Sequence, residues 1–105
     1  MDDTITPTPD PNSPTSFYIP FDLQGCFREL DNALPANMRE DIRACEEANL
    51  VRHHFGLGMW MRNNWGLWSK SSPLKQYFDD LGMREADDAS SKILMSYCRY
   101  LNQKL

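Results

Sequence analysis

The strongest constraint on the fold is the spacing of the apolar residues, which recur every three or four positions along most of the chain. This is the repeat of an α-helix with one buried face, whereas a half-buried strand alternates at every second position. No stretch alternates with period two over the length of a strand. We therefore predict an all-α protein, a compact bundle of four to five short helices. The residues of the helical stripes are Leu23, Phe27, Leu30 and Leu34; Leu50, His54, Leu57 and Met61; Leu74, Tyr77, Phe78 and Leu81; and Ile93, Leu94, Tyr97 and Leu101.

Capping residues and prolines indicate where these helices begin and end. Asp22 can cap the first helix, and Pro35 ends that helix and suits the first turn of the next. Ser72 followed by Pro73 predicts another helix start, and Gly82 a C-terminal cap. The predicted helices cover residues 23–34, about 36–46, about 47–62, 73–81 and 88 to about 102.

The first sixteen residues differ in composition from the rest of the chain. They hold four of the seven prolines and no aromatic residue. Such a segment buries too little apolar surface to offset its chain entropy. We therefore predict a disordered Pro/Asp-rich tail over residues 1–16 and a single helical domain over residues 17–105, which is long enough for one modest core.

The charge distribution bears on the class of partner. The net charge is −4, and Asp2, Asp3 and Asp10 contribute −3 of it, which leaves −1 for residues 17–105. The chain as a whole lacks a basic footprint, so no nucleic-acid partner is expected. It also has no run of about 18 apolar residues, so no membrane span is expected. Residues 48–78 contain no acidic residue, and their basic residues predict one positive face: Arg52, Arg62, Lys70 and Lys75.

The cysteines bear on the compartment and on metal binding. Cys26, Cys45 and Cys98 are far apart, odd in number and without a CxxC pair. We interpret them as small buried apolar residues in a reducing compartment, and we expect neither a metal nor a cofactor. The polar N-terminus has no signal-peptide core, which predicts a cytoplasmic protein, although export by a route without a cleaved signal stays open.

The least ordinary stretch is residues 53–68, HHFGLGMWMRNNWGLW, which holds all three tryptophans and both histidines. Gly56 and Gly58 interrupt a helical pattern, at about 1 kcal/mol each relative to alanine. Either a neighbouring helix or ring packs against their backbone, or the gap admits a ligand. The tryptophans likewise form either a cap on the core or an exposed aromatic platform for a partner.

Six residues of this stretch are candidate binding residues: His54, Arg62, Asn63, Asn64, Trp65 and Trp68. His54 lies on a predicted buried stripe, where a satisfied core histidine is the alternative, whereas we expect His53 to be exposed. Arg62 and the two asparagines can simply end the third helix, because arginine favours the negative end of the helix dipole and asparagine tolerates the left-handed conformation. Alternatively, they supply a guanidinium fork and two amides to a carboxylate or phosphate.

The sequence predicts no catalytic residue. Adjacent histidines on a helix diverge by about 100°, so His53 and His54 cannot readily chelate one metal. Asp87 and Asp88 precede a predicted helix and are better explained as caps than as paired catalytic carboxylates. Ser90 and Ser91 lack the GxSxG setting of a nucleophile.

The run from His54 to Trp68 resembles the signature HxGLGxWIRNNWGLW of an uncharacterised bacterial family of short helical domains. Members continue with a helix that matches Leu74, Tyr77 and Phe78, and close with a DDMSSxIL-type helix that matches residues 87–101. The likeness covers roughly residues 18–102, with Ala89 where methionine is usual and the run Ser69 to Ser71 where a glycine pair is frequent. The family is a domain of unknown function, so the resemblance implies no catalytic role.

These observations favour a non-enzymatic protein-binding module of the immunity, antitoxin or inhibitor type, which acts by masking a protein partner. A second hypothesis is a small-ligand or phosphate/nucleotide-binding domain, possibly an enzyme, that uses Arg62, Asn63 and Asn64. A third is that the aromatic stretch is purely structural and that function lies on the charged second helix. The sequence leaves the oligomeric state open.

Overall fold

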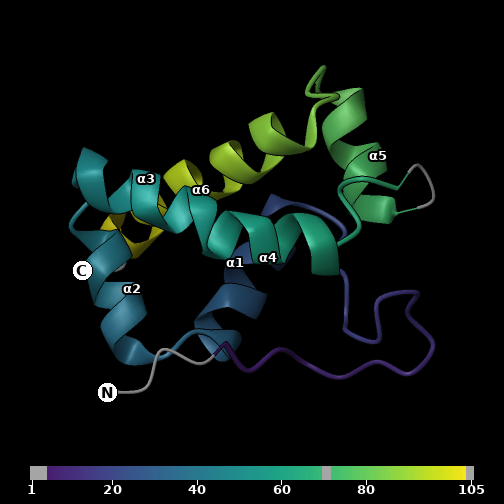
Figure 1. Cartoon of the computed structure of the whole chain (residues 1–105), viewed down its shortest axis with the longest axis horizontal. Coiled ribbons are helices and arrows are strands. Elements are labelled where there is room, and N and C mark those ends of the chain that lie inside the picture. The colour runs from purple at the N-terminus through teal and green to yellow at the C-terminus, as the bar shows by residue number, and fades with distance from the viewer. Residues whose placement is uncertain (1–4, 70–71, 104–105) are drawn as a thin grey trace.

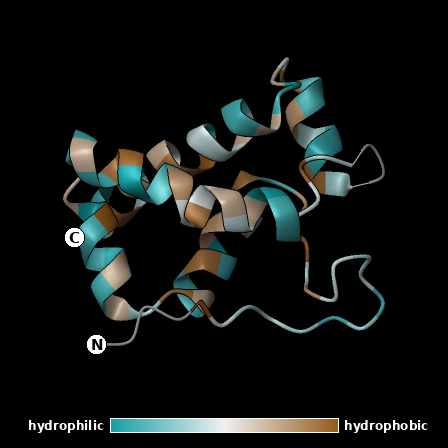
Figure 2. Ribbon diagram, viewed as in Figure 1, coloured by the Kyte–Doolittle hydropathy of each residue, from teal (hydrophilic) through white to brown (hydrophobic). Residues whose placement is uncertain are grey.

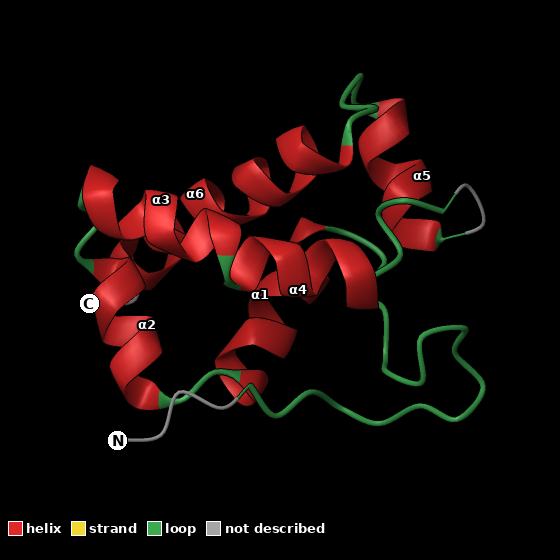
Figure 3. Cartoon of the chain, viewed as in Figure 1, coloured by secondary structure: helices red, strands yellow, loops and turns green. Residues whose placement is uncertain are grey.

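The computed structural model describes residues 5–69 and 72–103 of the chain (Figure 1). The described residues form no β-sheet, although Pro9 and Phe17 pair in an isolated antiparallel β-bridge. Figure 3 shows helices joined by short loops, and the all-α prediction is confirmed. The helices are α1 (Leu23–Ala33), α2 (Ala36–Arg43), α3 (Glu47–Phe55), α4 (Leu57–Asn64), α5 (Pro73–Asp80) and α6 (Ala86–Gln103).

Helices α1 and α5 begin where their capping residues predict, whereas Asp87, predicted to cap the last helix, lies in the first turn of α6. The Asp22 carboxylate accepts a hydrogen bond from the backbone N–H of Gly25 at 2.8 Å, one of the N–H groups that a helix start leaves free. The Ser72 hydroxyl accepts from the backbone N–H of Lys75 at 3.3 Å, with proline in the first turn. Gly82, after α5, has φ +85°, the left-handed conformation expected of a C-terminal glycine.

The predicted third helix is divided into α3 and α4, which is why the structure describes six helices. The break is at Gly56, whose φ of −86° and ψ of −77° depart from helical values. A glycine resists such a departure less than any other residue. On one side of this break α3 packs against α2 and α6, and on the other side α4 continues across α6 (Figure 1).

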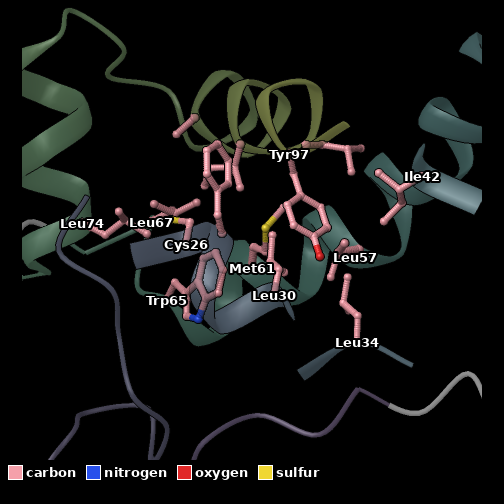
Figure 4. Packing of buried hydrophobic residues seen from close by; sticks show 14 of the residues in the cluster. Cys26, Leu30, Leu34, Ile42, Leu57, Met61, Trp65, Leu67, Leu74 and Tyr97 are labelled. Carbon is pink, nitrogen blue, oxygen red and sulfur yellow. The ribbon is translucent and has the colours of Figure 1, made fainter. Parts of the chain in front are cut away.

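The core lies beneath α6, the longest helix, which contacts α1, α2, α3 and α4. Its largest fully buried side chains are Trp65, Tyr97 and Phe78. Figure 4 shows Trp65 and Tyr97 on either side of Met61, with side chains from α1 below them. Brown and teal segments alternate along the helices in Figure 2, as expected for helices with one apolar face. None of the helices in the described part of the chain is both long and apolar enough to cross a bilayer.

Residues 5–16, which the sequence predicts to be a disordered tail, have a defined path along the helices. The backbone N–H of Thr6 donates to the Ala33 carbonyl at 2.8 Å. The N–H and the hydroxyl of Thr8 each donate to the Glu29 carboxylate at 2.9 Å. Glu29 is only 4% exposed, and a buried carboxylate requires such donors. Composition could not reveal this partner, because Glu29 lies 21 residues away. Residues 1–4 lie outside the described residues.

Candidate functional site

The two stretches that carry the family resemblance meet in the structure, where α3 and α4 pack on α6. His54, Gly58 and Arg62 follow one another at intervals of four residues on one side of this contact. Arg62 Nη1 donates to Ser90 Oγ at 2.8 Å, and His54 Nδ1 lies 3.1 Å from Ser91 Oγ. The contact between α4 and α6 is therefore polar as well as apolar.

Arg62 is a buried cross-link between helices rather than a free anion fork. The residue is 3% exposed, and its Nε lies 3.4 Å from a carboxylate oxygen of Asp87, which compensates the charge without an aligned hydrogen bond. A Cβ on Gly58 would lie 3.1 Å from Arg62 Nη1. Close packing thus explains Gly58, because a side chain there would crowd the Arg62 guanidinium.

The other candidate residues divide between the interior and the surface. Trp65 is fully buried, and its ring meets that of Trp60 edge-on at 5.8 Å. The Asn64 side chain donates to the Trp60 carbonyl at 3.0 Å, which ends α4 as a cap does. Asn63 Oδ1 accepts from Trp68 Nε1 at 3.0 Å, and Trp68 is 61% exposed. The predicted residues thus lie partly in the core and partly at the surface. Most of their polar groups have partners within the chain, but Trp65 Nε1 is buried without a hydrogen bond.

The prediction for the two histidines is reversed. His53, expected to be exposed, is buried, and its Nε2 lies 2.7 Å from Asp41 Oδ2. His54, expected to be buried, is only partly so. The reason is that α2 folds back beside α3 and covers the face that carries His53. The hydrogen bond to His53, aided by the charge of Arg52, holds the pKa of Asp41 below its usual range.

The positive face predicted from the acid-free stretch is also corrected. Arg52 pairs with Asp41, Lys75 with Asp79, and Arg62 with Asp87. These carboxylates come from other parts of the chain or from the end of the same helix, so proximity in sequence misrepresents the charge pattern in space. Lys70, the fourth basic residue, lies outside the described residues.

The interpretation of all three cysteines as unpaired buried residues is wrong. Cys45 and Cys98 form a disulfide with their Cα atoms 5.8 Å apart, a usual separation for such a bond. Cys26 is free and buried, as predicted. The sequence does not reveal the pairing, because the two cysteines are separated by 53 positions. Among the residues described, no cluster of histidine, cysteine and carboxylate side chains could hold a metal ion.

The feature that sequence reasoning missed is a groove between α3 and α6, which we call the α3–α6 groove. Its volume is about 500 Å³. Val51 and Met95 are 51% and 49% exposed, large fractions for side chains of this type. The sequence does contain one sign of it, because Val51 is an apolar residue outside the stripe Leu50, His54, Leu57 and Met61. Phe55 and Met59, which are also outside that stripe, are exposed as well. The lining consists of Leu50, Val51, Leu94 and Met95 with Cys45, Glu47, His54 and Ser91.

The Ser91–His54 pair in this groove does not form a nucleophile–base site. A hydrolytic serine needs a base that is oriented by a third group, and donors for the developing oxyanion. Ser91 lies inside α6, where the helix uses its backbone N–H. No carboxylate in the described part of the chain is hydrogen-bonded to His54. The pair instead satisfies two polar groups at the edge of an apolar surface.

A larger hollow, of about 930 Å³, lies between α2 and α3. Its lining includes the apolar Met38 and Leu57 and, beside the Asp41–His53–Arg52 cluster, the polar Asn37, Glu40, Glu46 and Asn49. The central charges of this cluster neutralise one another. Its central charged groups are therefore already paired within the chain, whereas the α3–α6 groove exposes apolar side chains that a partner could cover.

Fold and site together define a small all-α domain whose signature stretch builds the core and leaves an apolar groove beside it. The family model described as "Domain of unknown function (DUF6794)" matches residues 19–101, and the chain belongs to that family. The comparisons with curated proteins and with solved structures gave no match.

Proposed function

We propose that this domain is a non-enzymatic protein-binding module that receives an amphipathic helix of a partner protein in the α3–α6 groove. The observation that carries this proposal is the exposure of adjoining apolar side chains, Val51 and Met95, on the two walls of one groove. Single exposed apolar residues are ordinary on a protein surface, but a contiguous patch in a hollow marks an interaction site. A groove between two helices is a recurrent receptor for a third.

The charge of the lining supports one kind of partner helix. Among the described residues that line the groove, Glu47 carries the carboxylate, and it is exposed. A helix with leucine- or methionine-type residues on one face, and a lysine or arginine placed to reach Glu47, complements this surface. The apolar contacts would supply most of the affinity, whereas a pair with an exposed carboxylate adds little.

The mode of action that suits such a module is masking. Covering a partner's amphipathic helix blocks whatever else that helix binds, and this is how proteins of the inhibitor, antitoxin and immunity type act without chemistry of their own. The phosphate-binding alternative rested on Arg62, Asn63 and Asn64. The guanidinium is buried, and both asparagine side chains are engaged within the chain.

We also propose a cytoplasmic location. The odd number of cysteines supports it, because domains of oxidising compartments usually pair their cysteines. In the cytoplasm glutathione and thioredoxin keep most protein thiols reduced, so a disulfide such as Cys45–Cys98 would be a reversible bond there.

The test is capture of the partner by the tagged full chain, compared with groove variants. Val51→Asp and Met95→Asp each place a charge in the groove and are expected to lose the same stoichiometric protein. Leu81→Asp is the matched control, because Leu81 is 56% exposed at the end of α5, far from α3 (Figure 1). A synthetic helix from that protein should then bind the wild type and neither groove variant. Equal capture by the groove variants and the control overturns the proposal.

A further inference from the structure

We propose that the Cys45–Cys98 disulfide is a redox-controlled clamp on the α3–α6 groove, closed when oxidised and loosened by a dithiol reductant. This inference rests on the proposed function for its consequence, since the groove is the surface that it would regulate. The disulfide itself, its position and its accessibility are properties of the fold.

The position of the bond connects it to the groove. Cys45 lies in the turn between α2 and α3 and lines the groove beside Glu47. Cys98 lies on α6, one helical turn beyond Leu94, which lines the opposite wall. The bond therefore joins the two walls at one end of the groove and fixes their separation there.

The two cysteine residues differ in their exposure to a reductant. Cys45 is exposed, whereas Cys98 is 4% exposed. A thiolate of the reductant attacks Sγ of Cys45 and forms a mixed disulfide, while the electron pair of the broken bond leaves on Cys98 Sγ, which takes up a proton. The reductant's second thiolate then attacks its own sulfur in the mixed disulfide and releases Cys45, which is also protonated. The reductant leaves as a disulfide, and the protein has gained two electrons and two protons.

The backbone at Cys45 gives the turn a reason to move once the bond is broken. Cys45 has φ +56°, a left-handed conformation that is unfavourable for a residue with a side chain. Cys45 directly follows the C-terminal cap of α2, and its N–H donates to the Ile42 carbonyl at 3.0 Å, so the end of the helix and the cross-link together hold this conformation. After reduction Cys45 can return to a right-handed or extended conformation, and that return shifts the start of α3 relative to α6.

The rest of α2 stays attached without the disulfide, so the clamp can open without unfolding the domain. Ile42 is fully buried in the core. The Asn102 side chain donates to the Arg43 carbonyl at 2.8 Å and to the Cys98 carbonyl at 3.0 Å, which ties the end of α2 to α6. The expected change is therefore confined to the turn and the groove end.

The test is amide hydrogen exchange of the full chain, oxidised by glutathione disulfide and then reduced by dithiothreitol. We expect reduction to raise the exchange rate of residues 44–51 by about tenfold or more, with no change in α1. The double variant Cys45→Ala, Cys98→Ala is the matched control and should exchange at the faster rate with or without dithiothreitol. Equal exchange in the oxidised and reduced protein overturns the clamp.

A second measurement examines the chemistry directly. Alkylation in denaturant, which exposes the buried thiols, followed by mass analysis should find one free thiol in the oxidised chain and three after equilibration with an excess of reduced over oxidised glutathione. Three thiols before reduction, or one after it, overturn the proposal. Neither measurement involves a partner, so the clamp can fail while Val51→Asp still abolishes binding, and the binding proposal can fail while the clamp holds.

Discussion

At Gly58 the absence of a side chain is a packing requirement imposed by another residue four positions later. A Cβ on Gly58 would lie 3.1 Å from Arg62 Nη1, so the guanidinium, which Ser90 holds by a hydrogen bond, would have to shift by a few tenths of an ångström. Gly56 is different, since the nearest atom to its Cβ position is the Arg52 carbonyl at an ordinary 3.7 Å. The two glycines of this motif are thus explained differently. Gly58 leaves space for a buried charge, and Gly56 lies at the break between α3 and α4.

These causes predict opposite effects of alanine. Gly58→Ala gains about 1 kcal/mol of helix propensity, but it displaces a buried guanidinium from its hydrogen bond at a cost of about 1–3 kcal/mol, so stability should fall by about 1 kcal/mol. Gly56→Ala should leave stability unchanged or raise it by up to about 1 kcal/mol. Urea denaturation of the two variants measures the difference. A stabilised Gly58→Ala would show that Arg62 is free to move.

The tryptophans provide a second contrast at the residue scale. Trp65 is fully buried, so Trp65→Ala should lower stability by about 3–5 kcal/mol, enough to unfold much of a marginal domain. Trp68 is mostly exposed, so Trp68→Ala should change stability by no more than about 0.5 kcal/mol. Circular dichroism during thermal unfolding separates these outcomes. A folded Trp65→Ala protein with native melting temperature would contradict the placement of this ring in the core.

At the scale of the elements, the contact between α2 and α3 should depend on pH. The pKa of Asp41 is held below its ordinary value of 3.8, mainly by the hydrogen bond to His53. A carboxyl with a lowered folded-state pKa stabilises the fold above its unfolded pKa, and this contribution is lost as the pH falls through the folded-state value. The stability difference between wild type and Asp41→Asn should therefore be largest near neutral pH and shrink below 3.8.

Denaturation across pH measures this difference, with Glu46→Gln as the control because Glu46 is an exposed carboxylate on the adjoining turn. The control should show a much smaller change with pH. A constant difference between wild type and Asp41→Asn from neutral to acid pH would mean that the Asp41–His53 bond contributes nothing that titrates.

The helices were largely predictable because their determinants are local. Capping by Asp22 and Ser72, and the stripe on α6, act within a few residues and were confirmed. The disulfide, the exchange of roles between His53 and His54, and the path of residues 5–16 depend on elements that are distant in sequence. Composition and periodicity contain no information about which of those elements meet.

At the scale of the whole molecule, the residues that build the core and those that form the proposed binding surface lie next to each other in the sequence. One part of residues 53–68 turns inward as Trp65 and Arg62, and builds the contact of α4 with α6. The beginning of the same stretch belongs to α3, and on this helix Val51 and Phe55 are exposed. The candidate site predicted from the sequence combined rare residues, whereas the proposed site consists of common apolar residues that the fold leaves uncovered.

Amide chemical shifts of the isotope-labelled full chain, recorded while it is titrated with the captured partner, report directly where the partner binds. We predict that the largest shifts fall on Leu50, Val51, Leu94 and Met95, with Asn63 and Trp68 unperturbed. Shifts centred on Asn63 and Trp68, with the α3–α6 groove unchanged, would contradict this prediction.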